Sequence, residues 1–189
     1  MKKLVFVSNR NNNHQEALAR EFWKIYGSDY TYVAMTPVIA GERAPEVRDQ
    51  NYEPYVLRAY ESSEAMSEAQ TLIDEAECVI VGGNPKYILT VRNRLKRGKL
   101  TFLYSERFLK GPLWKDVARF LTYSACFGVR SYAQNARSKF FLLCASAFAA
   151  WDYNACGLFR NKAYRWGYFP KIRYLGQQIS RIEASGFGS

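Results

Sequence analysis

Short apolar runs that alternate with amphipathic segments are the feature that most constrains how this chain can fold. Residues 4–7 (Leu-Val-Phe-Val) and 78–81 (Cys-Val-Ile-Val) are continuous apolar runs, which is typical of strands buried on both faces of a parallel sheet. We expect further strands at residues 30–35, 100–104, 139–145 and 162–168. The alternation predicts right-handed strand–helix–strand crossovers. The expected fold is therefore α/β, with a single Rossmann-like doubly wound, mainly parallel sheet that has helices on both faces.

Each segment between these strands carries a signal for a helix or a loop. We expect helices to begin near Asn13, Ser62 or Ser63, Pro85, Pro112 and Ser146, and residues 36–54 to form a long loop. In the first helix Leu18, Phe22 and Ile25 recur at spacings of four and three, which predicts one apolar stripe. Gly27 can end that helix.

The net charge of +10 is distributed unevenly along the chain. Residues 1–84 hold 8 Lys/Arg against 13 Asp/Glu, whereas residues 85–139 hold 13 against 2. In the helix after Pro85 we expect the basic residues, Arg94 among them, to lie away from the inward-facing apolar stripe. Such a block favours an anionic partner, which is nucleic acid, an anionic membrane surface or a phosphorylated ligand; a solvated basic face is the alternative.

The same sequence argues against several classes of protein. No apolar run approaches the roughly 20 residues that span a bilayer, and the run after Lys3 is too short for a signal peptide, so we expect a cytoplasmic protein. The four cysteines form no C-x-x-C pair and the chain has one histidine, so we expect structural thiols and no metal site. The cysteines are Cys78, Cys126, Cys144 and Cys156.

Polar or glycine-rich residues follow four of the predicted strands. Ligands of open α/β sheets bind beyond the carboxyl ends of the strands, so we expect the binding residues there. They are Asn9, Asn11, Gly83, Asn84, Ser105, Arg107, Lys110 and Ser146. The turn after the first strand holds no glycine, and no phosphate-binding G-x-x-x-x-G-K occurs, which disfavours an NAD enzyme or a phosphate-loop NTPase.

Two side chains are candidates for acid–base chemistry. His14 lies near the expected start of the first helix, where the helix dipole favours a neutral imidazole. A neutral imidazole can deprotonate a sugar or lipid hydroxyl, although a surface histidine with no role is the alternative. Glu106 is an acidic residue in an otherwise basic segment. It is a candidate for one of three roles: a base, a hydrogen-bond acceptor for the substrate, or the partner of Arg107. We favour the role of acceptor.

Three longer segments resemble a known family. They are LTFLYSER at residues 100–107 followed by Lys110-Gly111, CASAFAAWDY at residues 144–153 followed by Gly157-Leu158-Phe159, and KAYRWGYFP at residues 162–170. These segments resemble the N-terminal domain of bacterial GT-B-fold glycosyltransferases. The likeness covers most of residues 1–170.

The resemblance implies an organisation and a function. Such enzymes place an acceptor-binding N-terminal domain opposite a C-terminal domain that binds the nucleotide-sugar. Residues 1–170 would be the acceptor-side domain, and residues 171–189 a partly flexible tail or the start of a linker. The acceptor would be a cell-surface glycan or a lipid-linked sugar. This domain would bind no cofactor, and the chain would be inactive without the second domain and its nucleotide-sugar donor.

The resemblance also implies a partner for the basic block, residues 85–139, at the membrane. Its basic residues could dock on the anionic inner face, and they include Lys96, Arg97, Lys99, Lys110, Lys115 and Arg119. A nucleic-acid-binding module is the competing interpretation, and it is disfavoured because no nucleic-acid recognition motif is present. A standalone flavodoxin-like or regulatory module is the third, and it does not explain the segments that resemble glycosyltransferases.

Overall fold

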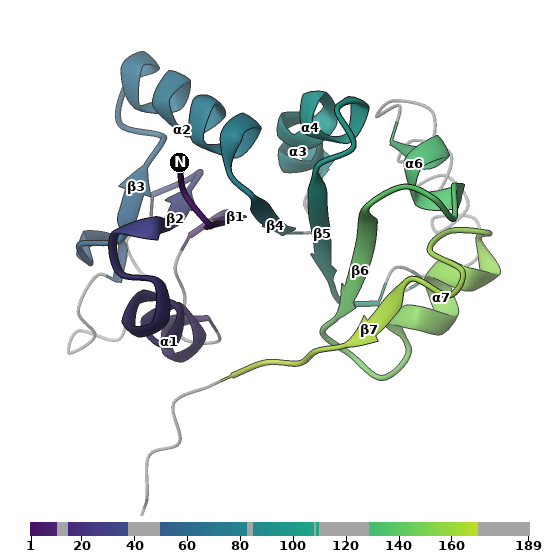
Figure 1. Ribbon diagram of the computed structural model, residues 1–189. Coiled ribbons are helices and arrows are strands. Elements are labelled where there is room, and N and C mark those ends of the chain that lie inside the picture. The colour runs from purple at the N-terminus through teal and green to yellow at the C-terminus, as the bar shows by residue number, and fades with distance from the viewer. Residues whose placement is uncertain (11–14, 38–49, 83–84, 108, 110–128, 170–189) are drawn as a thin grey trace, which may run out of the picture.

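The computed structural model describes residues 1–10, 15–37, 50–82, 85–107, 109 and 129–169. Its centre is a seven-stranded, wholly parallel sheet with strand order β3-β2-β1-β4-β5-β6-β7 (Figure 1). The strands are β1 (Leu4–Ser8), β2 (Tyr30–Ala34), β3 (Val56–Arg58), β4 (Cys78–Gly82), β5 (Leu100–Ser105), β6 (Phe140–Cys144) and β7 (Ala163–Arg165). The predicted Rossmann-like α/β fold is confirmed.

The helices connect these strands. They are α1 (Glu16–Tyr26), α2 (Ser63–Glu75), α3 (Pro85–Ile88), α4 (Arg92–Lys96), α6 (Arg130–Gln134) and α7 (Ala149–Ala155), with short 3-10 turns η1 (Gly27–Asp29), η2 (Gln50–Tyr52) and η3 (Leu89–Val91). Ser62 caps α2, since its hydroxyl accepts a hydrogen bond from the Ala65 N–H at 3.1 Å, as predicted. The helix expected after Pro112 lies outside the described residues.

Two apolar layers flank the sheet. On one face, strand residues such as Val5 and Leu142 pack with residues of α2, α3, α4, α6 and α7. On the other face, Phe6 and Tyr32 pack with α1, which is the one helix of the described residues that contributes to this layer. After β7 the chain runs along this second face toward α1 (Figure 1), and the Tyr168 ring meets the Tyr104 ring edge to face at 6.4 Å.

The apolar stripe of α1 differs from the prediction in one residue. Leu18, Ala19 and Phe22 pack against the sheet, whereas Ile25 is 70% exposed. At 100° per residue, Ile25 lies about 70° from the centre of this stripe and therefore beyond its edge, which the four-and-three spacing of the sequence did not resolve.

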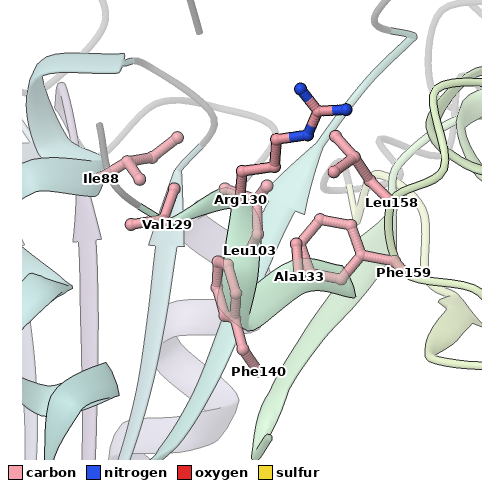
Figure 2. A pocket seen from close by; sticks show the side chains of 8 residues that line it. All are labelled: Ile88, Leu103, Val129, Arg130, Ala133, Phe140, Leu158 and Phe159. Atoms are coloured by element: carbon pink, nitrogen blue, oxygen red, sulfur yellow. The ribbon is translucent and has the colours of Figure 1, made fainter. Parts of the chain in front are cut away.

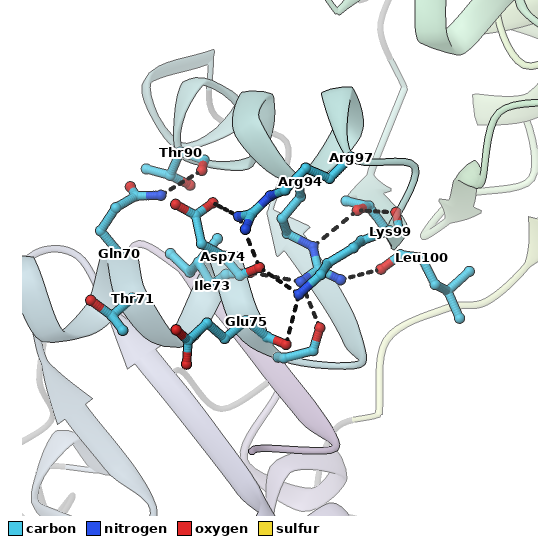
Figure 3. A network of polar contacts seen from close by, with 12 residues as sticks. Gln70, Thr71, Ile73, Asp74, Glu75, Thr90, Arg94, Arg97, Lys99 and Leu100 are labelled. Carbon is cyan, nitrogen blue, oxygen red and sulfur yellow. Dashed lines mark hydrogen bonds and ion pairs between the residues drawn. The ribbon is translucent and has the colours of Figure 1, made fainter.

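The prediction that Arg94 lies away from the core is wrong. Its side chain is fully buried, and all five of its N–H groups have acceptors (Figure 3). Four acceptors are the carbonyl oxygens of Ile73, Ala76, Glu77 and Leu100 at 2.7 to 3.3 Å, and the fifth is the Thr101 hydroxyl at 3.2 Å. The last carbonyls of a helix have no partner within the helix and carry its negative dipole end, so the C-terminus of α2 accounts for the buried cation.

Two further residues of the basic block converge on the same helix end. Arg97 and Lys99 both donate to the Asp74 carbonyl, at 3.0 and 2.9 Å, and Lys99 also donates to the Glu75 carbonyl at 3.0 Å (Figure 3). Lys162 likewise binds the C-terminal end of α6, because its Nζ donates to the Asn135 carbonyl at 2.9 Å. Part of the positive charge therefore serves the fold itself.

Candidate functional site

The strand order reverses at β1 and β4. The chain fills β2 and β3 on one side of β1 before it crosses to β4 and fills the other side, and ligands of such sheets bind where the order reverses. Gly82 ends β4 at this point. A Cβ on Gly82 would lie 3.2 Å from the Ser8 Oγ and 3.4 Å from the Val7 carbonyl oxygen, so the glycine permits the close approach of the two strand ends.

Asn9 organises the end of β1. Its Oδ1 accepts from the Ser8 hydroxyl at 3.1 Å and from the Arg10 N–H at 2.9 Å. Its carbonyl accepts from both the N–H and the hydroxyl of Thr36, at 2.7 and 3.0 Å, which ties the ends of β1 and β2 together. Within the described residues, the Asn9 Nδ2 has no protein acceptor, so this half of the amide can serve a ligand.

Two buried tyrosines, on β2 and β5, belong to strands that end at this edge. The Tyr32 hydroxyl lies within hydrogen-bond distance of the Arg10 carbonyl, at 2.8 Å, and of the Gln15 side-chain oxygen. Burial raises the pKa of Tyr32 well above its ordinary value. Burial, helped by the nearby charge of Glu106, raises the pKa of Tyr104 to about 12. Both phenols therefore stay protonated at neutral pH and act as hydrogen-bonding groups rather than as bases.

A second polar cluster stands at the ends of β5 and β6. The Arg107 guanidinium binds the Asp152 carboxylate with two N–H groups, at 3.2 and 3.3 Å, and the Leu109 N–H donates to the same carboxylate at 3.0 Å. Asp152 is fully buried, whereas the Arg107 side chain is 42% exposed. The Tyr153 hydroxyl donates to the Ser105 Oγ at 2.9 Å, so α7 fixes the end of β5.

The structure brings five of the predicted site residues to this edge of the sheet. Asn9 follows β1, Ser105 ends β5, Glu106 and Arg107 follow it, and Ser146 follows β6. The Arg107 ion pair is made with Asp152, and the Glu106 side chain is exposed. The predicted residues His14, Asn11, Gly83, Asn84 and Lys110 lie outside the described residues.

Three of these residues differ in how far their polar groups are already bonded. Ser105 is engaged on both sides, because Tyr153 donates to its hydroxyl at 2.9 Å and this hydroxyl donates to the Glu106 carbonyl at 3.1 Å. Arg107 uses its Nε and Nη2 for Asp152, which leaves its Nη1 without a partner in the described part of the chain. The Ser146 hydroxyl is buried and has no partner there either. The edge therefore presents the Arg107 Nη1 and the exposed side chain of Glu106, while the Ser146 hydroxyl is enclosed.

Sequence reasoning missed the groups that hold these side chains in place. Asp152 is an acid in the apolar stretch 147–153, which could have signalled a buried carboxylate that needs a cation. Tyr32, Tyr104 and Gln15 gave no such signal, because strand tyrosines and a helix-start glutamine are ordinary in any sheet protein.

The structure also holds a small apolar cavity beneath α6 (Figure 2). Its lining is Ile88, Leu103, Val129, Ala133, Phe140, Leu158 and Phe159, together with Arg130. In Figure 2 the guanidinium points away from the apolar side chains. A ligand pocket needs polar groups that converge on its occupant, so this cavity belongs to the packing of the core.

Comparison with known protein families, curated proteins and solved structures gave no match. Among the residues that the structure describes, no group of histidine, cysteine and acidic side chains could hold a metal ion. No helix in the described ranges is long and apolar enough to cross a membrane.

Proposed function

We propose that this chain is the acceptor-side domain of a glycosyltransferase, which binds a cell-surface glycan or a lipid-linked sugar at the carboxyl edge of its sheet. A second domain would bind the nucleotide-sugar donor and complete the enzyme. The proposal rests on the resemblance of residues 100–111 and 144–170 to bacterial GT-B enzymes, and on the chemistry of the edge.

The observation that carries the proposal is the mixture of donors and acceptors at the strand ends. The Asn9 amide and the Arg107 Nη1 donate, and the exposed Glu106 carboxylate accepts. A sugar hydroxyl is itself a donor and an acceptor, so it suits such a mixture. A phosphate accepts hydrogen bonds only, and the exposed carboxylate of Glu106 would repel it.

The turn after β1 supports the same conclusion. Dinucleotide sites need glycines there, so that the backbone can approach the pyrophosphate. Residues 8–14 (Ser-Asn-Arg-Asn-Asn-Asn-His) contain none. The Asn9 carbonyl instead accepts two hydrogen bonds from Thr36.

In this proposal the exposed Glu106 accepts a hydrogen bond from the acceptor hydroxyl and holds it for the donor. Asn9 and Arg107 orient the rest of the sugar. His14 keeps the role of a candidate base.

The alternative of a nucleic-acid-binding module is weakened by the use of the basic side chains. Arg94, Arg97 and Lys99 bond to carbonyls near the end of α2, so they offer fewer free cations to a phosphate backbone. Docking on an anionic membrane, which the sequence also suggested, then depends on the exposed Lys96 and on basic residues outside the described ranges.

A glycan array tests the proposal. We expect the chain to retain a subset of immobilised glycans. The Glu106→Gln variant should retain them about 10–100-fold more weakly, since a hydrogen bond to a charged group contributes about 1.5–3 kcal/mol, and Asn9→Ala about 2–10-fold more weakly, since a neutral hydrogen bond contributes about 0.5–1.5 kcal/mol. Glu68→Gln is the matched control, because Glu68 is exposed on α2 and remote from the edge. Equal retention by all four proteins, or none by the unaltered chain, would contradict the proposal.

A further inference from the structure

Two large aromatic side chains stand exposed beside the proposed acceptor site. Phe148 immediately precedes α7 and is 60% exposed, and Trp151, in the first turn of that helix, is 65% exposed. Residues three apart on a helix lie on the same face. Asp152 and Tyr153 are buried, so α7 is held to the protein by its other face and presents the two rings outward.

Arg107 joins this aromatic face to the strand edge. Its guanidinium carbon lies 5.1 Å from the centre of the Phe148 ring, while two of its nitrogens are fixed by Asp152. Ser105 and Cys144 are partners in the register of β5 and β6. The segment with Glu106 and Arg107 and the segment that leads into α7 therefore leave the sheet side by side.

The edge is longer than one sugar ring. The edge runs from Asn9, after β1, to the segment that follows β6, and these strands are separated by β4 and β5. Three interstrand spacings amount to about 14 Å. The two aromatic rings lie at the far end of this row, on the element that follows β6.

On the premise of the proposed function, we infer that Phe148 and Trp151 form a second acceptor subsite. They stack a sugar residue next to the one held by Asn9 and Glu106, and Arg107 lies between the two sugars. The acceptor is then a glycan of at least two residues, and its chain runs along the strand ends from β1 to α7.

The mixed character of the surface favours a glycan over an apolar partner. A lipid tail or a helix of another protein would cover the exposed charged side chains of Arg107 and Glu106 together with the rings, and taking charged groups out of water is costly. A sugar offers an apolar C–H face to an aromatic ring and hydroxyls to the neighbouring charged groups. Small-molecule sites combine aromatic walls and a few placed polar groups in this way.

The test compares glycans of one to four sugar residues on the same array. For the glycans that the chain retains, we expect retention to rise at least tenfold from one residue to two or three. Trp151→Ala should abolish this rise, whereas Trp151→Phe should keep most of it. Tyr52→Ala is the matched control, because Tyr52 is 60% exposed and precedes β3 at the opposite edge of the sheet.

The outcomes separate the two proposals. If length has no effect, or if Trp151→Ala retains long glycans as well as the unaltered chain does, the second subsite is refuted and the proposed function stands. If no glycan of any length is retained, the proposed function fails and the subsite fails with it. If Tyr52→Ala weakens the retention of long glycans as much as Trp151→Ala does, the placement of the second subsite on α7 is also refuted.

Discussion

Replacing Arg94 by leucine would leave the C-terminus of α2 and the start of β5 without five hydrogen bonds. The buried carbonyls of Ile73 and Ala76 and the partly buried carbonyls of Glu77 and Leu100 would lose this donor. The Thr101 hydroxyl would keep its bond to the Lys99 carbonyl. Each buried polar group left without a partner costs about 1–3 kcal/mol. The loss of the charge offsets part of this sum, because burial of the guanidinium is itself unfavourable and lowers the pKa of Arg94 to about 10.

The expected net destabilisation is about 3–5 kcal/mol, the magnitude found when one partner of a buried charged network is removed. Domains are stable by about 5–15 kcal/mol in all, so the effect is large. For a chain of this length it corresponds to a fall in Tm of about 6–20 °C.

Urea unfolding followed by circular dichroism, together with the Tm, measures the effect. Arg92→Leu is the matched control, because Arg92 is exposed on the same helix and should change stability by at most about 0.5 kcal/mol. Arg94→Lys keeps the charge but has three donors on one nitrogen, so we expect an intermediate loss, and this variant decides the matter if the leucine variant does not fold. Equal stability of the Arg94 and Arg92 variants would refute the reasoning.

Two further predictions concern the site. Asp152→Asn removes the charge that holds Arg107 and should destabilise the chain by about 1–3 kcal/mol in the same unfolding assay. The loss is limited because water can hydrogen-bond to the half-exposed Arg107 in place of the carboxylate. An unchanged unfolding midpoint would contradict the role given to this pair. Burial and the nearby Glu106 raise the pKa of Tyr104 to about 12, so the pKa of this side chain is higher in the folded chain than in the unfolded chain. Its contribution to stability is therefore complete below about pH 10 and is lost as the pH rises toward 12. Unfolding measured between pH 9 and 12 should show this decline, and a Tyr104→Phe variant should show a smaller one; identical declines would remove Tyr104 as the cause.

The sequence predicted the sheet because its strands are buried on both faces. Continuous apolar runs such as residues 78–81 are typical of strands buried on both faces. The helical spacing of apolar residues located α1 and α2. β3 was missed because Val56–Arg58 is only three residues long and half-buried, too short for any period to show. The helix after Pro85 was predicted as one element and is instead α3, η3 and α4.

The site was predicted from topology rather than from motifs. The carboxyl ends of parallel strands meet at one edge, which is why Asn9, Glu106 and Ser146 could be chosen before any geometry was known. The partners that fix them could not, because Arg107 and Asp152 are 45 residues apart in the chain and their pairing depends on how α7 packs. The role of Arg94 could not be predicted for the same reason, since three of the four carbonyls that it binds lie 17 to 21 residues away in the chain.

An NMR titration of the ¹⁵N-labelled chain with the glycan that it retains best on the array measures whether the carboxyl edge of this sheet binds a sugar acceptor. We predict that the amide shifts will concentrate at Asn9, Glu106, Arg107 and Ser146, and that the Glu106→Gln variant will need about 10–100-fold more glycan to reach the same shifts. Shifts that concentrate on α2 and α4, or that are unchanged by Glu106→Gln, would contradict the account.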